Sequence, residues 1–540
     1  MGLFGNLKVN LKYTKIHCST GQPPPWTTSA VRSQDPPPAA GPPPYSSSLV
    51  VELAERSAYN GVSLNLITYL TGDLGESTAS AAAGVNAWSG MALMTPLLGA
   101  FVADSYLGRY RTIAVASLLD FLGLAMLTLS AILPSLSQQS QVILVYFSLY
   151  LVAFAQGGHK PILEAFGADQ FDENNPQELI SRSSFFNWWY FGMNIGITVT
   201  IVVLTYVQDN ISWGLGFGIP CILVVIALVV FLMGTKSYRY YLLEGECPFT
   251  RIWRGCTVLV KRNCISREER EIQRLHGADE SRIEENGDAQ RVEEAKGVLR
   301  LFPIWATCLP YGIICAQCNT FFTKQGSTMD RRIGSTFNVP PAALQSLFCG
   351  AILAFIPVYD RIILPISRKF SKTPSGLTTL QRIGIGFNFS IMSMVVAALV
   401  EIKRLKTARE FALVDRPDIT IPMSLWWLVP QYVFIGISEV FIVIGQQEFF
   451  YDQVPDALRS LGLALYLSIY GIGNFISSFL VSVIDGVTES AGESWFSNNL
   501  NRAHLDYYYW FLAVLNALSF VIYMYCAHAF VYKKKDNVAL

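Results

Sequence analysis

Charged residues are scarce in this chain. Asp, Glu, Lys and Arg make up 15% of its 540 residues, whereas soluble domains carry about 25%. The 40 basic and 40 acidic residues balance, so neither a nucleic-acid partner nor a strongly acidic one is indicated. The five histidines are too dispersed for a metal cluster. This composition excludes an ordinary soluble domain and indicates a chain that lies in a lipid bilayer.

Motifs of soluble enzymes are missing as well. The sequence contains no P-loop, no G-x-S-x-G and no H-E-x-x-H. We therefore expect no enzyme, no ATP-driven pump and no cofactor. The ten cysteines form no convincing disulfide framework. Cys315 and Cys318 spell C-x-x-C inside an apolar helix, where small buried residues are a better account than a redox or metal site.

Twelve apolar runs are long enough to cross a bilayer, which needs about 20 residues. Backbone groups in lipid must be satisfied internally, so the runs are helices and the fold class is an all-α membrane protein. The runs lie near residues 48–71, 84–105, 112–134, 141–164, 184–207, 211–234, 298–322, 340–366, 377–402, 422–449, 459–485 and 507–532.

Polar segments divide these runs into two sets of six. Residues 1–47 are rich in proline and cannot bury enough apolar surface to order themselves, so we expect a disordered cytosolic tail. Residues 235–297 alternate in charge and separate a bundle over 48–234 from a second bundle over 298–532. We interpret 235–297 as a cytosolic linker and 533–540 as a short cytosolic tail.

Basic residues follow the even-numbered spans, which places both termini in the cytosol. The loop between the ninth and tenth spans is an exception, because it carries Lys403, Arg404, Lys406 and Arg409 on the opposite side. The residues that follow the rule are Arg109, Arg111, Lys236, Arg239, Arg368, Lys369, Lys372, Lys533, Lys534 and Lys535.

The most informative stretch is VVELAERSAYNG at 50–61, where three ionised groups enter the first span. Glu52, Glu55 and Arg56 stand at i, i+3 and i+4 and so share one helix face. Each such charge near a helix centre costs roughly 2.5 to 3.5 kcal/mol on an insertion scale. One interpretation is an ion pair of Glu52 with Arg56 that only holds helices together. It does not account for Glu55. A relay for protons or substrate accounts for all three groups.

Two further ions lie inside apolar runs. Lys160 of the fourth span needs an anionic partner, either a first-span carboxylate or an anionic substrate. The alternative is that its chain reaches to the membrane interface. Glu439 of the tenth span has about ten apolar residues on each side and suits a group that binds and releases protons. His159 is expected to be packed rather than to act as a ligand.

Uncharged polar residues inside other spans have two interpretations. Tyr190 and Asn194 of the fifth span and Gln317 of the seventh are either helix-packing residues or ligands. Asp104 with Arg109 ends the second span, and Asp360 with Arg361 ends the eighth. This faint repeat suggests two related bundles.

Several ordered blocks resemble the proton-dependent oligopeptide transporters, in their plant nitrate-and-peptide branch. Glu52-Leu-Ala-Glu55-Arg56 matches the family's E-x-x-E-R/K motif, and the resemblance covers residues 48–532. NLITYLTG and LALYLSIYGIGNFISS look closest to the fifth plant subfamily. The other matching blocks are FVADSYLGRYRTI, GGHKP, FGADQFD, NWWYFGMNIG and QEFFYDQVPDALRSLG.

The resemblance implies a major-facilitator fold with a central site between two bundles. It implies that Glu52, Glu55 and Arg56 couple transport to protons, that Lys160 meets the anionic end of the substrate, and that Glu439 faces an amino end or helps to close the inner gate. The remaining expected substrate-binding residues are Tyr59, Tyr190, Asn194 and Gln317. The expected gate or interface residues are Asp104, Arg109, Asp169 and Glu448.

This sequence departs from the family pattern at three places. The lead-in SSSLVV is short, which implies a first span shortened on its cytosolic side or an incorrectly assembled N-terminus. The tandem tyrosine that often follows the first motif is Tyr59-Asn60. The seventh-helix histidine that binds nitrate in one plant relative is Cys315, so nitrate binding by that mode is in doubt, although Lys160 or Arg56 could bind it.

We therefore expect a proton-coupled symporter of small anionic or zwitterionic solutes such as nitrate, di- or tripeptides or plant metabolites. The alternatives are a proton-independent facilitator or exporter of the same solutes, and a transport-dead membrane receptor. The proton is the expected coupling ion, and the expected partners are a small-molecule substrate and the lipid bilayer, with no nucleic acid. We expect a monomeric transport unit in the plasma or vacuolar membrane.

Overall fold

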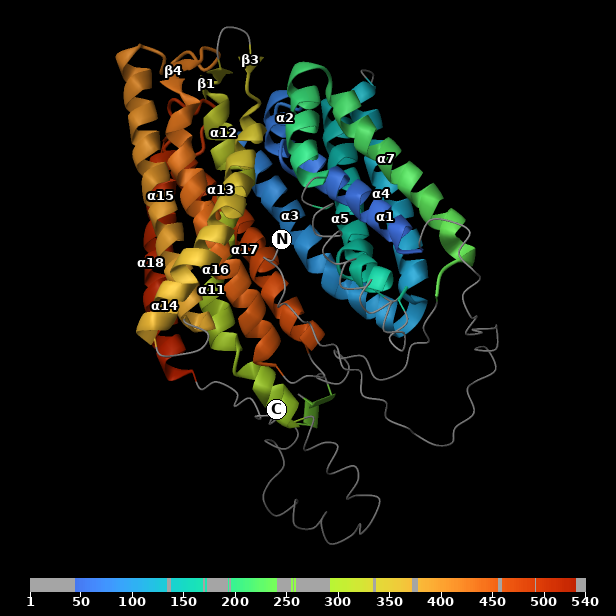
Figure 1. Cartoon of the computed structure of the whole chain (residues 1–540). Helices are drawn as coiled ribbons and strands as arrows, with labels where there is room; N and C mark the ends of the chain where they lie inside the picture. Colours follow the sequence, from blue (N-terminus) through green and yellow to red (C-terminus); the bar gives the residue numbers. More distant parts are fainter. Residues whose placement is uncertain are drawn as a thin grey trace, which may run out of the picture.

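Long helices make up most of the computed structural model, and they gather into two bundles side by side (Figure 1). The chain from α1 to α7 forms one bundle and the chain from α11 to α18 forms the other; we call them the first half and the second half. The structure describes residues 44–133, 137–168, 170–171, 193, 196–239, 254–255, 257–258, 292–333, 337–371, 377–454, 459–490 and 492–530.

The helices of the first half are α1 (Pro44–Ser63), α2 (Leu66–Gly72), α3 (Thr78–Val102), the π-helix η1 (Ala103–Leu107), α4 (Arg109–Ile132), α5 (Gln138–Ala168), a helix over 196–210, α7 (Trp213–Met233) and the short η2 (Gly234–Lys236). Those of the second half are α11 (Phe302–Ala316), η3 (Gln317–Asn319), α12 (Phe321–Ser327), η4 (Pro341–Leu344), α13 (Gln345–Val358), the π-helix η5 (Tyr359–Ile363), α14 (Leu364–Ser371), α15 (Thr379–Glu410), η6 (Leu425–Leu428), α16 (Val429–Asp452), α17 (Arg459–Ser490) and α18 (Leu505–Ala529).

Ten helical segments in the described part of the chain are long and apolar enough to cross a membrane. They agree with ten of the twelve runs expected from the sequence. The first expected run is divided into α1 and α2, and the fifth is described mainly as the helix over 196–210. Helix α1 begins at Pro44, four residues before the expected start at residue 48.

Local sequence sets several of these helix ends. Ser77 caps α3 by accepting from the Ser80 amide. Thr378 and Gln381 form a capping box at the start of α15. Gly108 has φ +75°, a conformation that a residue with a side chain rarely adopts, and it turns the chain from η1 into α4.

The faint repeat between the two halves has a structural counterpart. The segment with Asp104 is the π-helix η1, which continues α3, and the segment with Asp360 and Arg361 is the π-helix η5, which continues α13. π-helices are rare and are found mostly as single turns within α-helices. The same uncommon backbone at matching places supports two related bundles.

Two small sheets lie at one end of the molecule, which we call the strand end (Figure 1). Strand β1 (Met329–Asp330) pairs in parallel with β4 (Ile421–Ser424), and β2 (Arg332–Ile333) pairs antiparallel with β3 (Phe337–Asn338). Hydrogen bonds from Arg332 hold the pKa of the exposed Asp330 carboxyl below its usual value. We call the opposite end, where α4 begins with Arg109 and η2 ends with Lys236, the basic end.

The exception to the charge rule is explained by pairing at the strand end. Lys403 to Arg409 belong to the last turns of α15 rather than to a loop, which corrects the sequence expectation. Arg404 is fully buried and bonds both carboxylate oxygens of Glu401, at 2.6 and 2.8 Å. Lys406 lies 3.9 Å from Glu410. Two of the four basic residues are therefore neutralised within the helix, which weakens their effect on orientation.

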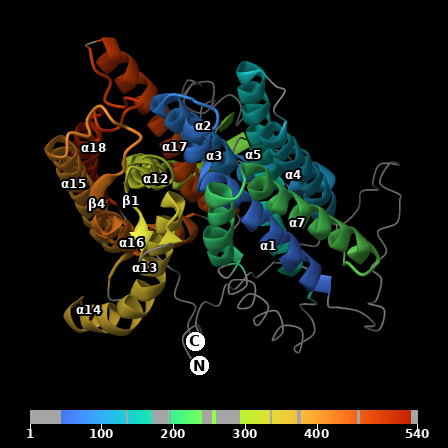
Figure 2. The ribbon, with the colours of Figure 1, turned by 90° about the horizontal axis from the view of Figure 1, so that it is seen from above.

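The two halves meet along α3 and α17, which lie close together in the middle of the view from above (Figure 2). Thr78 at the start of α3 donates its amide proton to Asn498, at 2.8 Å. About two turns further along α3, Asn86 donates a hydrogen bond to Ser477 of α17, at 3.0 Å. A Cβ on Gly90 would lie 2.9 Å from the carbonyl oxygen of Gly471, so the two backbones nearly touch. This seam fixes the halves against each other from the strand end to the middle.

Candidate functional site

Glu52, Glu55 and Arg56 lie on adjacent turns of α1, and both glutamates are only 1% exposed. Arg56 Nε donates to Glu52 Oε1 at 2.8 Å and lies 3.5 Å from Glu55 Oε2. The three groups therefore share one face, as their spacing predicts. Neither carboxylate oxygen of Glu55 accepts a hydrogen bond from any residue that the structure describes. Glu55 is therefore a buried acid whose described partner is Arg56, with no hydrogen bond from a described residue.

Lys160 of α5 lies beside the same face, but its ammonium contacts a ring. Its Nζ is 4.3 Å from the centroid of Tyr59, one turn after Arg56. Tyr59 in turn stacks on Trp88 of α3, with ring centroids 5.3 Å apart. Within the described residues, Lys160 makes no direct ion pair with Glu52 or Glu55, although their charges and that of Arg56 act on it. The cation thus sits on an aromatic platform within reach of both acids.

Close helix packing holds Lys160 in this position. A Cβ on Gly99 of α3 would lie 1.7 Å from the carbonyl oxygen of Gly157, so only glycine permits this approach of α3 to α5. Thr95 of α3 donates to the carbonyl of Ala153 at 2.7 Å, and Trp88 donates to that of Leu149, also at 2.7 Å. These contacts lie along the three turns before Lys160 and fix the position of its backbone.

Glu439 of α16 forms a second polar centre in the other half. Tyr311 of α11 donates its hydroxyl proton to Glu439 Oε2 at 2.6 Å, and the Cys315 thiol lies 3.9 Å from the same oxygen. The Tyr311 ring meets Tyr470 of α17 edge-on, with centroids 6.0 Å apart. Glu439 itself is half-buried. The centre therefore offers one carboxylate in an aromatic and thiol surrounding.

The other predicted site residues have packing contacts, lie near helix ends or fall outside the described residues. Gln317 is fully buried and donates to Ile313, Ser477 and Tyr508, which are the contacts of a helix-packing residue. Glu448 lies 3.8 Å from Arg382 within the second half. Arg109 opens α4 at the basic end, and Asp104 belongs to η1, with its side chain outside the described set. Asp169, Tyr190 and Asn194 lie outside the described residues.

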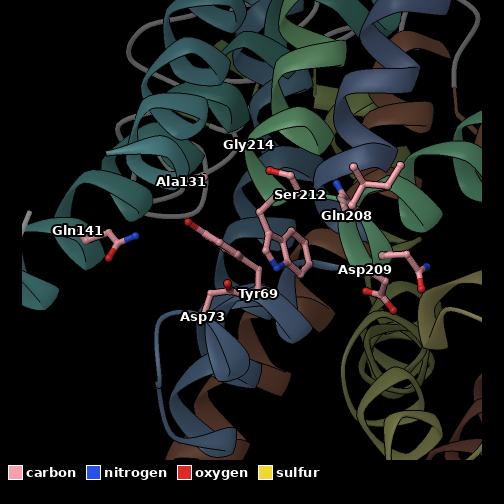
Figure 3. A pocket seen from close by; sticks show the side chains of 11 residues that line it. Tyr69, Asp73, Ala131, Gln141, Gln208, Asp209, Ser212 and Gly214 are labelled. Atoms are coloured by element: carbon pink, nitrogen blue, oxygen red, sulfur yellow. The ribbon is translucent and has the colours of Figure 1, made fainter. Parts of the chain in front are cut away.

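A pocket of about 450 Å³ opens at the strand end of the first half. The close-up shows Tyr69, Asp73 and Gln141 on one side and Gln208 with Asp209 on the other (Figure 3). This pocket contains none of the predicted site residues. We place the functional site at the buried charges of α1 and α5 and not here, because polar residues at a helix end are readily solvated, whereas ions inside a span are retained at a cost.

Polar contacts between the halves at the strand end were not predicted from the sequence. Lys324 of α12 donates to Thr71 of α2 at 2.8 Å. Arg331 lies 3.6 Å from Asp209, the residue at the edge of the pocket in Figure 3. Asn65 also donates to Asp209, at 2.9 Å. The partners within each contact are far apart in the chain, and Lys324 lies two residues beyond the end of the seventh expected run.

A metal or redox centre finds no support in the described residues, where no three His, Cys, Asp or Glu side chains gather closely enough to hold a metal ion. The cysteines within this part are free thiols, Cys315 and Cys318 among them. What the arrangement offers instead is two buried acids, a guanidinium and an ammonium in one half and a carboxylate in the other. Such groups bind charged solutes and protons.

Known proteins are similar to this chain in sequence and in fold. The sequence profile of the POT family matches residues 110–497. Protein NRT1/ PTR FAMILY 5.10 of Arabidopsis thaliana is 56% identical over 514 residues, which cover 90% of this chain and 92% of that protein. Its name agrees with the fifth-subfamily resemblance of the sequence.

Solved structures confirm the fold. An auto inhibited POT family peptide transporter superimposes with a TM-score of 0.72 at 21% identity, over 92% of this chain and 99% of that one. A POT family transporter in complex with 5-aminolevulinic acid superimposes with a TM-score of 0.64 at 17% identity, over 90% and 95%. Together with the match of the family profile and the close relative, these likenesses show that the chain is a membrane transporter and belongs to the POT family.

Proposed function

We propose that the chain is a proton-coupled symporter of small anionic or zwitterionic solutes. Protons would bind at the carboxylates of α1, and the anionic end of the solute would bind at Lys160. Glu52, Glu55, Arg56 and Lys160 are the residues to which we assign coupling.

The position of Lys160 is the observation that carries this proposal. An ammonium inside a membrane span needs an anion nearby, yet within the described residues the half-buried Lys160 is held against the Tyr59 ring, 4.3 Å from its centroid, and not against a carboxylate. Its charge therefore remains available to a solute. A nitrate, a carboxylate or another small anion would replace the missing counter-ion.

Protonation of the acids would set the order of events. While Glu52 and Glu55 are ionised, their field attracts Lys160 and Arg56 and disfavours an approaching anion. A proton on Glu55 removes one negative charge from a site where neither of its oxygens accepts a hydrogen bond within the described part. The anion would then be bound by two cations against one remaining acid. Because the protonated protein would bind the anion more tightly, the movement of the proton and that of the solute would be coupled.

Glu439 extends the proposal to zwitterions. One POT family transporter of known structure is in complex with 5-aminolevulinic acid, which carries both a carboxylate and an amine. Here Lys160 in the first half and Glu439 in the second would take the two ends of such a solute. Because Glu439 accepts a hydrogen bond from Tyr311 at 2.6 Å, its orientation is fixed before the amine arrives.

The orientation proposed here puts the basic end and both termini in the cytosol, in the plasma or vacuolar membrane, with one chain as the transport unit. The basic residues at that end support the cytosolic assignment. The contacts of Lys324 with Thr71 and of Arg331 with Asp209 would then close the outer side. Rocking of the halves would break them when the outer side opens.

The proposal is tested with purified protein in liposomes, with nitrate and the dipeptide Ala-Ala as probes. Uptake of at least one probe should rise as the outside is made acidic, and an uncoupler should abolish accumulation. Uptake that is indifferent to both would contradict coupling and favour a proton-independent facilitator or exporter. Binding without flux would favour a receptor.

Two variants then test the named residues. Glu55→Gln removes the proton site at constant size, and it should retain exchange of the probe across the membrane but lose accumulation driven by a pH gradient. Lys160→Gln should weaken binding of both probes. A Glu55→Gln protein that keeps full pH-driven accumulation would remove Glu55 from the coupling mechanism.

A further inference from the structure

One buried acid of the first half takes no part in the mechanism above. Asp120 lies in the middle of α4 and is 0% exposed. Neither of its carboxylate oxygens has a hydrogen-bond partner among the residues that the structure describes. A buried carboxylate in this condition is costly, and such groups require an explanation.

Contacts across the interface of α4 and α5 locate its position. Ser117 of α4 is hydrogen-bonded to Nε2 of His159 on α5, at 3.0 Å. Two helix turns further along α4, a Cβ on Gly123 would lie 2.8 Å from Val152. The helices are antiparallel, and Asp120 stands midway between Ser117 and Gly123 on the same face. The residue opposite it must lie midway between 152 and 159.

That position holds Ala155 and Gln156. Both are fully buried, and neither the amide nitrogen nor the amide oxygen of Gln156 has a hydrogen-bond partner within the described residues. A small alanine beside it leaves room for a carboxyl group. A protonated Asp120 has an O–H donor that an ionised one lacks, and the amide oxygen of Gln156 is an acceptor without a donor. An ionised Asp120 can only accept from the Gln156 amide nitrogen, whereas a protonated Asp120 can also donate to the amide oxygen.

The electrostatic surroundings of Asp120 connect it to the coupling residues. Asp120 interacts electrostatically with Glu55 of α1 and with the Cys221 thiol of α7. On α5, His159 and Lys160 face the same interior, and both interact with Glu55 and Arg56. Two carboxylates that sense each other in an apolar interior share protons and do not ionise independently.

We propose that Asp120 is a further proton-carrying residue of this transporter, paired with Glu55. The set then contains three buried acids (Glu52, Glu55 and Asp120) and two half-buried cations (Arg56 and Lys160). Fully ionised, it has one excess negative charge, and a single bound proton balances it. Without Asp120 the same set is balanced with no proton at all. Asp120 therefore ensures that the site binds a proton before it binds an anion.

This inference rests on the proposed function for its transport consequence, but not for its first test. Infrared difference spectroscopy of the purified protein follows the carbonyl stretch of protonated carboxyl groups without any solute. Asp120→Asn keeps the size of the side chain and removes the acid. We expect the wild-type protein to have one protonated carboxyl band at neutral pH that Asp120→Asn lacks. Glu439 contributes equally to both spectra and cancels. Superimposable spectra would overturn the proposal.

The second test is the pH profile of Ala-Ala and nitrate uptake in liposomes. In Asp120→Asn, Glu55 has no second carboxylate with which to share a proton, so the proton affinity of the site should fall about tenfold and uptake should need about one pH unit more acid. Thr128→Val, on the same helix and bonded only to its own helix at Leu124, is the matched control and should keep the wild-type profile. Asp120→Glu restores the charge and should restore the profile, even if the rate falls.

The outcomes separate the two proposals. If wild-type uptake does not depend on pH, the proposed function fails, and the infrared comparison still decides the state of Asp120. If wild-type uptake depends on pH and Asp120→Asn keeps both the profile and the carboxyl band, Asp120 carries no proton and the inference fails. A shifted profile together with a lost band supports it.

Discussion

The ammonium of Lys160 lies 4.3 Å from the centre of the Tyr59 ring, and that ring stacks on Trp88. A cation above an aromatic face is stabilised without being neutralised. This relationship keeps a positive charge inside the first half while its attraction for an anion is preserved. Tyr59 thereby supports the ammonium to which we assign solute binding.

Replacement of the ring should therefore weaken the solute site. Tyr59→Leu removes a cation–π contact worth about 0.5–2 kcal/mol, so we expect KM for the transported probe to rise several-fold, with a smaller change in maximal rate. Tyr59→Phe keeps the ring face and should stay within about twofold of wild type. Initial uptake rates over a range of probe concentrations measure both. Equal effects of the two substitutions would assign the role to the hydroxyl group instead.

The contacts between the halves at the strand end should stabilise the conformation seen here. Lys324→Met with Asp209→Asn removes the hydrogen bond to Thr71 and the ion pair with Arg331. Partly exposed ion pairs contribute about 0.2–1 kcal/mol each, so together the losses should raise the population open at the strand end several-fold. Spin labels at Asp73 and Asp418, both exposed at this end, report the distance between the halves.

The control for that measurement is Lys406→Gln. Its pair with Glu410 lies within the second half and is largely exposed. The distance distribution should keep its wild-type form in this variant and gain a longer component in the double variant. A distribution that stays unchanged in the double variant would mean that these contacts do not control the opening.

The sequence predicted how the charged groups of α1 are placed, because that placement is local. Glu52, Glu55 and Arg56 share a face at fixed helical spacing, and Lys160 was conspicuous inside an apolar run. Periodicity says nothing about which helices are neighbours. The contact of Lys160 with Tyr59 instead of a carboxylate, and that of Arg331 with Asp209, depend on tertiary packing. They could not be read from spacing.

Charge counting misjudged the end of α15 for a related reason. A basic residue indicates the cytosolic side of the membrane only if it is solvated in a loop. Arg404 is 0% exposed. It bonds Glu401 three residues earlier, and Asn501 and the Leu500 carbonyl from the far end of the chain. The i, i+3 spacing of Glu401 and Arg404 was visible in the sequence. Its burial was not.

This buried pair should be important for stability. Arg404→Leu leaves Glu401 ionised in an apolar surrounding, which costs about 3–5 kcal/mol. Among the described residues, Gln325 alone would remain to donate to that carboxylate. Thermal unfolding of the detergent-purified protein should therefore occur at a clearly lower temperature. Lys406→Leu removes an exposed pair and should cost no more than about 1 kcal/mol. Equal melting temperatures for the two variants would show that the buried pair is dispensable.

The thiol of Cys315 stands where a nitrate-binding relative is expected to have histidine, and its neighbour decides what a histidine would do here. Cys315 Sγ lies 3.9 Å from Glu439 Oε2. An imidazolium at position 315 would therefore pair with Glu439 and be neutralised. Cys315→His alone should not raise nitrate uptake, whereas Cys315→His with Glu439→Gln should raise it at acidic pH, because the new cation then has no internal counter-ion. Nitrate uptake into liposomes measures both variants, with Glu439→Gln alone as the control. A gain by the single Cys315→His variant would show that Glu439 does not hold the imidazolium.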